Sequence, residues 1–185
     1  MPISPLYIAL IIVGVIVLLL IFMFNNLITL RNRVDNAWSQ IDVQLKRRLD
    51  LIPNLVESVK GYMRHERGLL KEITEARTSF MKAGTMKEKA KASNQITEAL
   101  KTIFAVAENY PNLKANENFL MLQEELSGTE SKIAYARQFY NDTAMSFNTS
   151  IQTFPGNTMA GMMNFNKRDY FQAEEEAKKP VKVQF

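Results

Sequence analysis

The sequence begins with an uninterrupted apolar segment. From Leu6 to Phe24 it runs LYIALIIVGVIVLLLIFMF, without a charged side chain. A helix of this length spans about 28 Å at ~1.5 Å per residue, close to the ~30 Å hydrocarbon core of a bilayer. The pattern predicts a transmembrane helix over residues 6–25, after a short tail at residues 1–5. A cleaved signal peptide fits less well, because MPISP has no basic residue and FMFNN offers no small-residue cleavage site.

A second pattern follows the span, in which apolar residues recur about every 3.6 positions. These residues are Val34, Trp38, Ile41, Leu45, Leu49, Ile52, Val56, Val59 and Met63. This spacing favours a globular helical bundle over a coiled coil, whose period is nearer 3.5. It continues to Phe80, and Gly84 is expected to end the helix. We expect a helix of about 58 residues from Asn26, continuous with the span or following it, and kinked at Pro53. The alternative is a new helix that Asp50 caps, with Pro53 in its first turn.

The remaining chain predicts further helices and no sheet. Helices are expected at 87–109, 116–154, 157–165 and 168–179, the last one acidic, and an extended tail at 180–185. The predicted fold class is therefore all-α: an N-terminal transmembrane helix and an antiparallel bundle of about four long helices over residues 26–179.

Charge and composition narrow the class of function. The chain has 23 Lys and Arg against 19 Asp and Glu, a net charge of +4, and the two signs are interleaved. Such a distribution indicates a solvated helical surface, and it lacks the dense basic patch that nucleic-acid binding requires. The chain has no cysteine, which excludes disulfides and thiolate metal sites.

The sequence lacks the sets of residues that form common catalytic and metal sites. The single histidine, His65, lies between Arg64 and Glu66 and has no glutamate three positions before it. A di-metal bundle needs two Glu-x-x-His units, and a zinc site needs more ligands than one histidine provides. No Ser-His-Asp set and no glycine-rich phosphate loop is present. The sequence therefore predicts no enzyme activity, no metal and no cofactor, and an exposed His65.

Several long motifs resemble one family. LRNRVDNAWSQIDVQLKRRLDLIPNLVESVKGY at 30–62 closely resembles the LemA family of bacterial membrane proteins. AENYPNLKANENFLMLQEELSGTESKIAYARQFYND at 107–142, FNTSIQTFP at 147–155 and DYFQAEEEAKKPVKVQF at 169–185 agree in the same order. The resemblance covers nearly the whole chain. It implies a bacterial inner-membrane protein with a helical-bundle domain, and it implies no particular reaction.

The flanks of the span predict its orientation. No Lys or Arg precedes the span, whereas Arg31 and Arg33 follow it. The positive-inside rule then places the N-terminus outside and the C-terminal domain in the cytoplasm.

Polar residues within the family motifs form a candidate site. Glu130, Arg137, Asn141 and Asn148 are spaced by seven, four and seven, which places them on one stripe of a helix. With three residues of the first helix, the candidates are Arg48, Asp50, Asn54, Glu130, Arg137, Asn141 and Asn148. We favour a hydrogen-bonded network that fixes helix register, since buried charges and amides must be paired. A ligand or partner site is the alternative.

These observations favour a non-enzymatic, membrane-anchored scaffold. We expect it to contact membrane lipid, to form homo-oligomers and to display a surface for other envelope proteins, with the aromatic-rich segments 135–154 and 162–171 as candidate surfaces. The alternative is an adaptor that regulates another membrane protein, such as a protease or transporter. The methionines Met159, Met162 and Met163 are expected to pack inside the bundle, with a subunit or membrane contact as the alternative.

Overall fold

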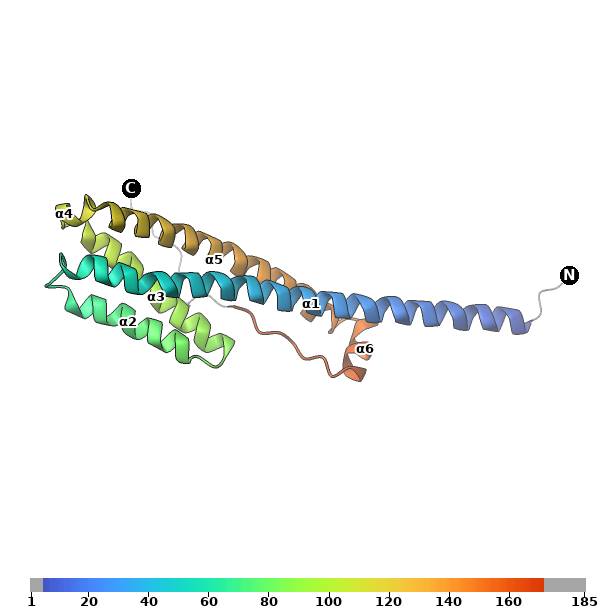
Figure 1. The fold of residues 1–185 in the computed structure, drawn as a ribbon. Coiled ribbons are helices and arrows are strands. Elements are labelled where there is room, and N and C mark those ends of the chain that lie inside the picture. Colours follow the sequence, from blue (N-terminus) through green and yellow to red (C-terminus); the bar gives the residue numbers. More distant parts are fainter. Residues whose placement is uncertain (1–4, 172–185) are drawn as a thin grey trace, which may run out of the picture. The chain divides into compact units, whose positions relative to one another are not determined.

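A computed structural model describes residues 5–171 of the chain (Figure 1). Within this range the secondary structure is helical and contains no strand, which confirms the predicted all-α class. The helices are α1 (Pro5–Lys60), α2 (Arg67–Lys82), α3 (Met86–Ala107), α4 (Pro111–Lys114), α5 (Glu117–Ser150) and α6 (Gly156–Met162). The extended tail predicted at 180–185 lies outside the described residues. Of the acidic helix predicted at 168–179, only residues 168–171 are described, and they are not helical.

The N-terminal part of α1 has the properties of a membrane span. Its side chains from residue 5 to residue 22 are all exposed, so none of these apolar residues is buried by the described part of the protein. By length and composition, α1 is the one helix of the described residues that is able to cross a membrane. This agrees with the span predicted at 6–25.

The described residues form two compact units, with boundaries inside α1 and α5 and in the non-helical segment after α6. Unit 1 comprises residues 5–38 and 139–169, and unit 2 comprises residues 39–138 and 170–171. Helices α1 and α5 contribute to both units. No loop or glycine-rich stretch marks the boundaries at 38/39 and 138/139, which is why the sequence pattern does not display them.

In unit 2, the long helix predicted to reach Gly84 is interrupted, and this expectation was wrong. Helix α1 ends at Lys60, residues 61–66 form a turn, and α2 returns antiparallel to α1. The apolar spacing kept its phase because Met63 is buried within the turn and Ile73 is buried on α2. Lys60 followed by Gly61 is a typical signal for the end of a helix. The apolar spacing continues across it, and so the signal was not recognised.

Helix α1 passes through Pro53 without ending, so no new helix starts at Asp50. Proline has no N–H to donate to the carbonyl of the residue four positions earlier, which here is Leu49. The guanidinium of Arg77 on α2 supplies the missing donor, with its Nε 3.0 Å from the Leu49 carbonyl oxygen. A tertiary hydrogen bond thus replaces the helical bond that Pro53 removes.

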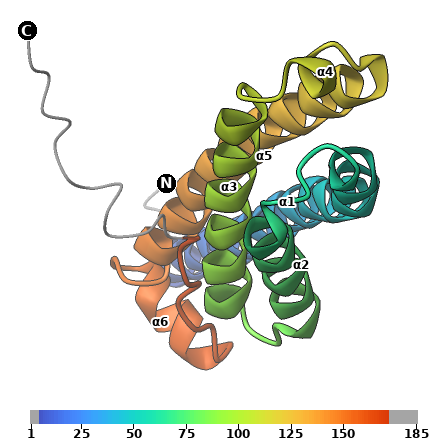
Figure 2. The same cartoon turned by 90° about the vertical axis from the view of Figure 1, so that its left-hand side faces the viewer.

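Helix α3 begins at a capping box and buries the face that its sequence predicts. The Thr85 hydroxyl accepts from the Glu88 N–H, while the Glu88 carboxylate accepts from the N–H groups of Gly84 and Thr85. These backbone donors lower the pKa of Glu88. Helices α2 and α3 pack side by side (Figure 2). The buried face of α3 includes the predicted residues Ala92, Ile96, Leu100, Ile103 and Ala107.

In unit 1, the end of α5 runs antiparallel to α1. Trp38 contacts Tyr140 edge to face, with ring centroids 5.8 Å apart. Helix α5 was predicted to reach Phe154 but ends at Ser150; residues 151–155 form a turn, and α6 begins at Gly156. A Cβ at Gly156 would lie only 2.2 Å from the Ser150 carbonyl oxygen, so this approach requires glycine.

The methionine patch does not pack inside the helical bundle as expected. Met162 is 81% exposed, and Met159 and Met163 are only partly buried. Phe154, predicted on the buried face of α5, is 85% exposed because the helix stops before it.

Candidate functional site: a buried arginine cluster beside an apolar groove

A buried arginine lies at the centre of unit 2. Arg48 projects from α1, and its side chain has no exposed surface. Its Nη1 donates to Glu130 Oε2 at 2.7 Å and to Thr97 Oγ1 at 3.0 Å. Its Nη2 donates to the Ser93 hydroxyl at 2.8 Å and to the Ser93 carbonyl at 3.2 Å. The cluster therefore ties together α1, α3 and α5.

The positive charge of Arg48 is paired with the negative charge of Glu130. Burial lowers the pKa of Arg48, and the charge of Glu130 and the hydrogen bond to it oppose that shift. An arginine remains protonated at neutral pH even so, because its ordinary pKa lies far above 7. Thr97 donates to Glu130 Oε1 at 2.7 Å, so both carboxylate oxygens are engaged. A buried cation is tolerable only when it is paired in this way.

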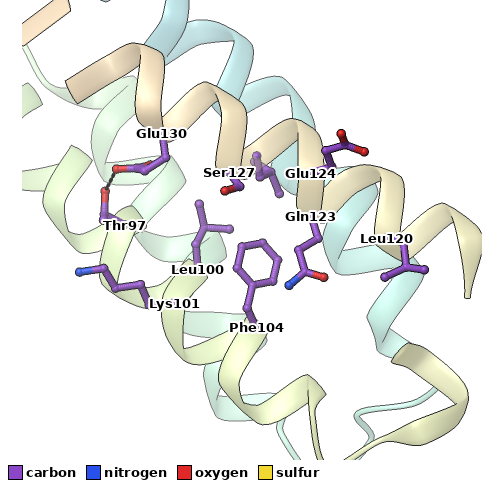
Figure 3. A pocket seen from close by; sticks show the side chains of 10 residues that line it. Thr97, Leu100, Lys101, Phe104, Leu120, Gln123, Glu124, Ser127 and Glu130 are labelled. Carbon is purple, nitrogen blue, oxygen red and sulfur yellow. Dashed lines mark hydrogen bonds between the residues drawn. The ribbon is translucent and has the colours of Figure 1, made fainter. Parts of the chain in front are cut away.

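An apolar groove opens next to Glu130, between α3 and α5. Its cavity volume is about 540 Å³, and it is lined by Thr97, Leu100, Lys101, Phe104, Leu120, Gln123, Glu124, Leu126, Ser127 and Glu130. Figure 3 shows the α3 side chains facing those of α5 across this space. Leu100 and Leu126 are buried, whereas Leu120 is 46% exposed. The groove thus combines an apolar floor with a charged rim of both signs.

The structure brings together only some of the predicted site residues. Arg48 and Glu130 are in direct contact, whereas Asp50 and Asn54 are exposed on α1. Arg137 is partly buried on α5 and does not belong to the arginine cluster. The hydroxyl partners Ser93 and Thr97 were missed by sequence reasoning. Their signal was a pair of hydroxyl residues four positions apart, flanking Ile96 on the apolar face of α3.

Asn141 and Asn148, also on the predicted α5 stripe, belong to unit 1. Asn148 is 5% exposed and binds the backbone of Arg168 twice. Its amide donates to the Arg168 carbonyl at 2.9 Å, and its side-chain oxygen accepts from the Arg168 N–H at 2.8 Å. Asn141 is partly buried. Stripe members on either side of residue 138 therefore belong to different units.

Further contacts hold the segment after α6 in unit 1. The Tyr140 hydroxyl donates to the Asp169 carbonyl at 2.8 Å, and Arg168 pairs with Asp35 at 2.9 Å. Burial raises the pKa of Tyr140 to about 12. Side chains of α5 thus fix the backbone of Arg168 and Asp169. The spacing of residues in the sequence does not predict this role.

Potential metal ligands do not gather within residues 5–171. No group of three or more His, Asp or Glu side chains there is placed to hold a metal ion. The single histidine, His65, is exposed in the turn after α1. The arrangement can hold helices together and can receive an apolar side chain in the groove.

The fold and the site define the class: a membrane protein that carries one candidate transmembrane helix in its described part and a helical domain with a buried polar cluster. Residues 37–185 match the LemA family, and the chain belongs to that family.

Three curated relatives are similar over most of the chain. Protein LemA of Metamycoplasma hominis is 31% identical over 82% of this chain and 69% of its own length. Magnetosome protein MamQ 2 of Paramagnetospirillum magneticum is 23% identical over 88% of this chain and 69% of its own length. Magnetosome protein MamQ of Magnetospirillum gryphiswaldense is 20% identical over the same shares. None of these names is that of an enzyme.

Proposed function

We propose that this protein is a non-enzymatic membrane-anchored scaffold that self-associates through α5, beside the α3–α5 groove. The observation that carries the proposal is the open apolar groove, whose volume of about 540 Å³ is left unfilled by unit 2 itself. Apolar grooves between helices commonly receive the apolar face of another helix. The exposed His65, and the lack of a metal-holding cluster within residues 5–171, support a role without catalysis.

The exposed face of α5 in unit 2 carries a large apolar or aromatic side chain at each end. Leu120 is 46% exposed at one end of this face, and Tyr135 is 75% exposed at the other. Between them lie exposed small residues, Ser127, Gly128 and Ser131, at helical spacing. Small residues allow two helix backbones to approach closely.

Two copies of this face fit a two-fold arrangement. In an antiparallel pair of α5 helices centred between Ser127 and Gly128, Leu120 of one copy faces Tyr135 of the other, because both lie equally far from the centre. The aromatic ring then enters the open groove beside Leu120. Such a contact buries apolar surface that a monomer leaves in water.

Cysteine cross-linking in native membranes tests this arrangement, because the chain has no cysteine of its own. Ser127→Cys is expected to form a disulfide-linked homodimer, twice the 21.2 kDa of the monomer, under mild oxidation. Lys71→Cys is the matched control: its side chain is 75% exposed on α2, away from the α5 face, and it should remain monomeric.

The outcomes of the cross-linking distinguish a self-associating scaffold from an adaptor and from a monomer. A homodimer through position 127 alone supports self-association. A discrete adduct of another mass at position 127 would replace the scaffold by an adaptor that binds a different membrane protein. A monomer in both variants, with a monomeric mass by light scattering in mild detergent, would reject self-association.

Inner-membrane location and orientation form the second part of the proposal. Arg31 and Arg33 are exposed on α1 shortly after the apolar segment, which supports a cytoplasmic C-terminal domain. A reporter that is active only outside the cytoplasm, fused to the C-terminus, should therefore stay inactive. Activity of that reporter would reverse the orientation.

A further inference from the structure

Two apolar side chains of unit 1 are unusually exposed. Phe154 is 85% exposed and Met162 is 81% exposed, the highest values of any large apolar residue among residues 5–171. Both exceed Phe22 of the apolar span, which is 72% exposed. Large apolar side chains are normally buried in full or in part, so this pair needs a physical explanation.

Contacts between aromatic rings show where the C-terminal part of α5 lies along α1. Tyr140 contacts Trp38, and further along α5 the ring of Phe147 contacts Phe165, with centroids 5.8 Å apart. The guanidinium of Arg31 lies over the same Phe165 ring, 5.5 Å from its centroid. Phe147 and Arg31 therefore both lie next to Phe165 within unit 1.

Because the two helices are antiparallel, α5 after Phe147 and α1 before Arg31 extend in the same direction from this contact. Helix α5 continues for three residues beyond Phe147 to Ser150, and the turn at 151–155, which contains Phe154, follows directly. Phe24 is the last residue of the apolar segment. Met23 is partly buried and Leu27 is 2% exposed, although the span residues before them are exposed, so unit 1 covers α1 up to this point. Figure 1 shows α6 beside α1.

The charge of this region suits a lipid surface. Residues 143–168 include no Asp or Glu, in a chain that has 19 of them, and they end with Lys167 and Arg168. Arg31, whose side chain is 48% exposed, adds a cation at the same end of unit 1. Cations near a bilayer surface are attracted by anionic lipids; Arg31 and Arg168 both pair with Asp35, and Lys167 adds a further exposed cation.

We propose that residues 151–163, the turn after α5 together with α6, lie in the interface of the same bilayer that α1 spans. Phe154 and Met162 enter the boundary between headgroups and acyl chains, while Ala160, 3% exposed, faces the protein. The occupant of this apolar surface is lipid, because within unit 1 α6 lies beside α1 (Figure 1), the helix that carries the span, and Phe154 and Met162 are left exposed there. This contact does not depend on the α5 dimer of the proposed function.

Depth-dependent fluorescence quenching tests the lipid contact in the full chain. Single cysteines at Phe154→Cys and Met162→Cys carry bimane, in vesicles of phosphatidylcholine and phosphatidylglycerol that contain brominated lipid. Phe139→Cys is the matched control: the same residue type as Phe154, 49% exposed in the same unit, and about 16 Å before the end of α5 along the helix axis. Ile16→Cys marks the span itself.

Bromolipid is expected to quench the labels at 154 and 162 several-fold more than the label at 139, and nearly as strongly as the label at 16. Quenching at 154 and 162 as weak as at 139 would overturn the proposal. Iodide then identifies what covers the surface instead: strong iodide quenching indicates water, and protection from iodide indicates a protein partner.

Discussion

Arg48 and Glu130 form an ion pair across 82 residues of sequence, with Nη1 2.7 Å from Oε2. The two ends differ in exposure: the Arg48 side chain is sealed from solvent, whereas the Glu130 side chain is 37% exposed at the groove. Loss of the carboxylate therefore strands a buried cation, whereas loss of the arginine leaves a carboxylate that water can reach. The pair is structurally asymmetric.

This asymmetry predicts unequal costs of substitution. Glu130→Leu is expected to lower the free energy of unfolding by about 3 kcal/mol, because it leaves a buried charge without its counter-ion. Arg48→Met should cost less, and the double variant should recover part of the loss. Arg47→Met is the neighbouring control: its partner Glu125 and its own side chain are about half exposed, so the loss should stay below about 1 kcal/mol. Denaturant unfolding of the full chain in detergent measures all four. Equal losses for Glu130→Leu and Arg47→Met would contradict the buried-pair interpretation.

Pro53 and Arg77 are predicted to be energetically coupled. Arg77→Met should cost about 1 kcal/mol in the natural sequence, because the Leu49 carbonyl loses its donor. In a Pro53→Ala background the helix provides its own N–H to that carbonyl, so the same substitution should cost less. A double-mutant cycle by thermal unfolding measures the difference. Additive effects would mean that Arg77 does not substitute for the missing helical hydrogen bond.

Asn148 is predicted to hold the segment after α6 in place. Asn148→Ala removes both hydrogen bonds to the Arg168 backbone and should lower stability by about 2 kcal/mol. Hydrogen exchange of the Arg168 amide should accelerate in this variant. Asn36→Ala, at an exposed position of α1 in the same unit, is the control and should leave that exchange unchanged. Unaltered protection at Arg168 in Asn148→Ala would show that other contacts suffice.

Two glycines of α6 should respond oppositely to alanine. Gly156→Ala is expected to lower the melting temperature, because the new Cβ would meet the Ser150 carbonyl oxygen at 2.2 Å. A Cβ at Gly161 meets nothing within 4 Å, so Gly161→Ala should be neutral or stabilising by up to about 1 kcal/mol. Circular dichroism during heating compares the two variants. A Gly156→Ala protein as stable as the natural one would contradict the close approach.

Tyr140 predicts a stability change at high pH. Its folded pKa of about 12 is above the ordinary value of 10.0, so the unfolded chain releases the phenol proton first. The stabilising contribution of the neutral phenol is complete below pH ~10 and is lost as the pH rises through ~12. Relative to Tyr140→Phe, the natural protein should therefore lose stability over that interval. Absorbance titration of the six tyrosines should show Tyr140 ionising late, and early ionisation of all six would refute the burial effect.

The sequence alone determined the apolar span, the all-α class and the buried face of α3. These features depend on local periodicity, and the buried face of α3, from Ala92 to Ala107, follows from spacing alone. The family motifs similarly needed no coordinates.

Only the tertiary structure decided which partners the buried faces and polar groups meet. Apolar periodicity predicts which side of a helix is buried, but not which residues cover it. The turn at 61–66 preserves the phase of the apolar spacing, so the spacing does not reveal it. The α5 stripe looked like one network, yet Glu130 bonds Arg48 and Asn148 bonds the Arg168 backbone. Hydrogen bonds depend on atoms within about 3 Å, and only the folded chain brings residues 82 positions apart to that distance.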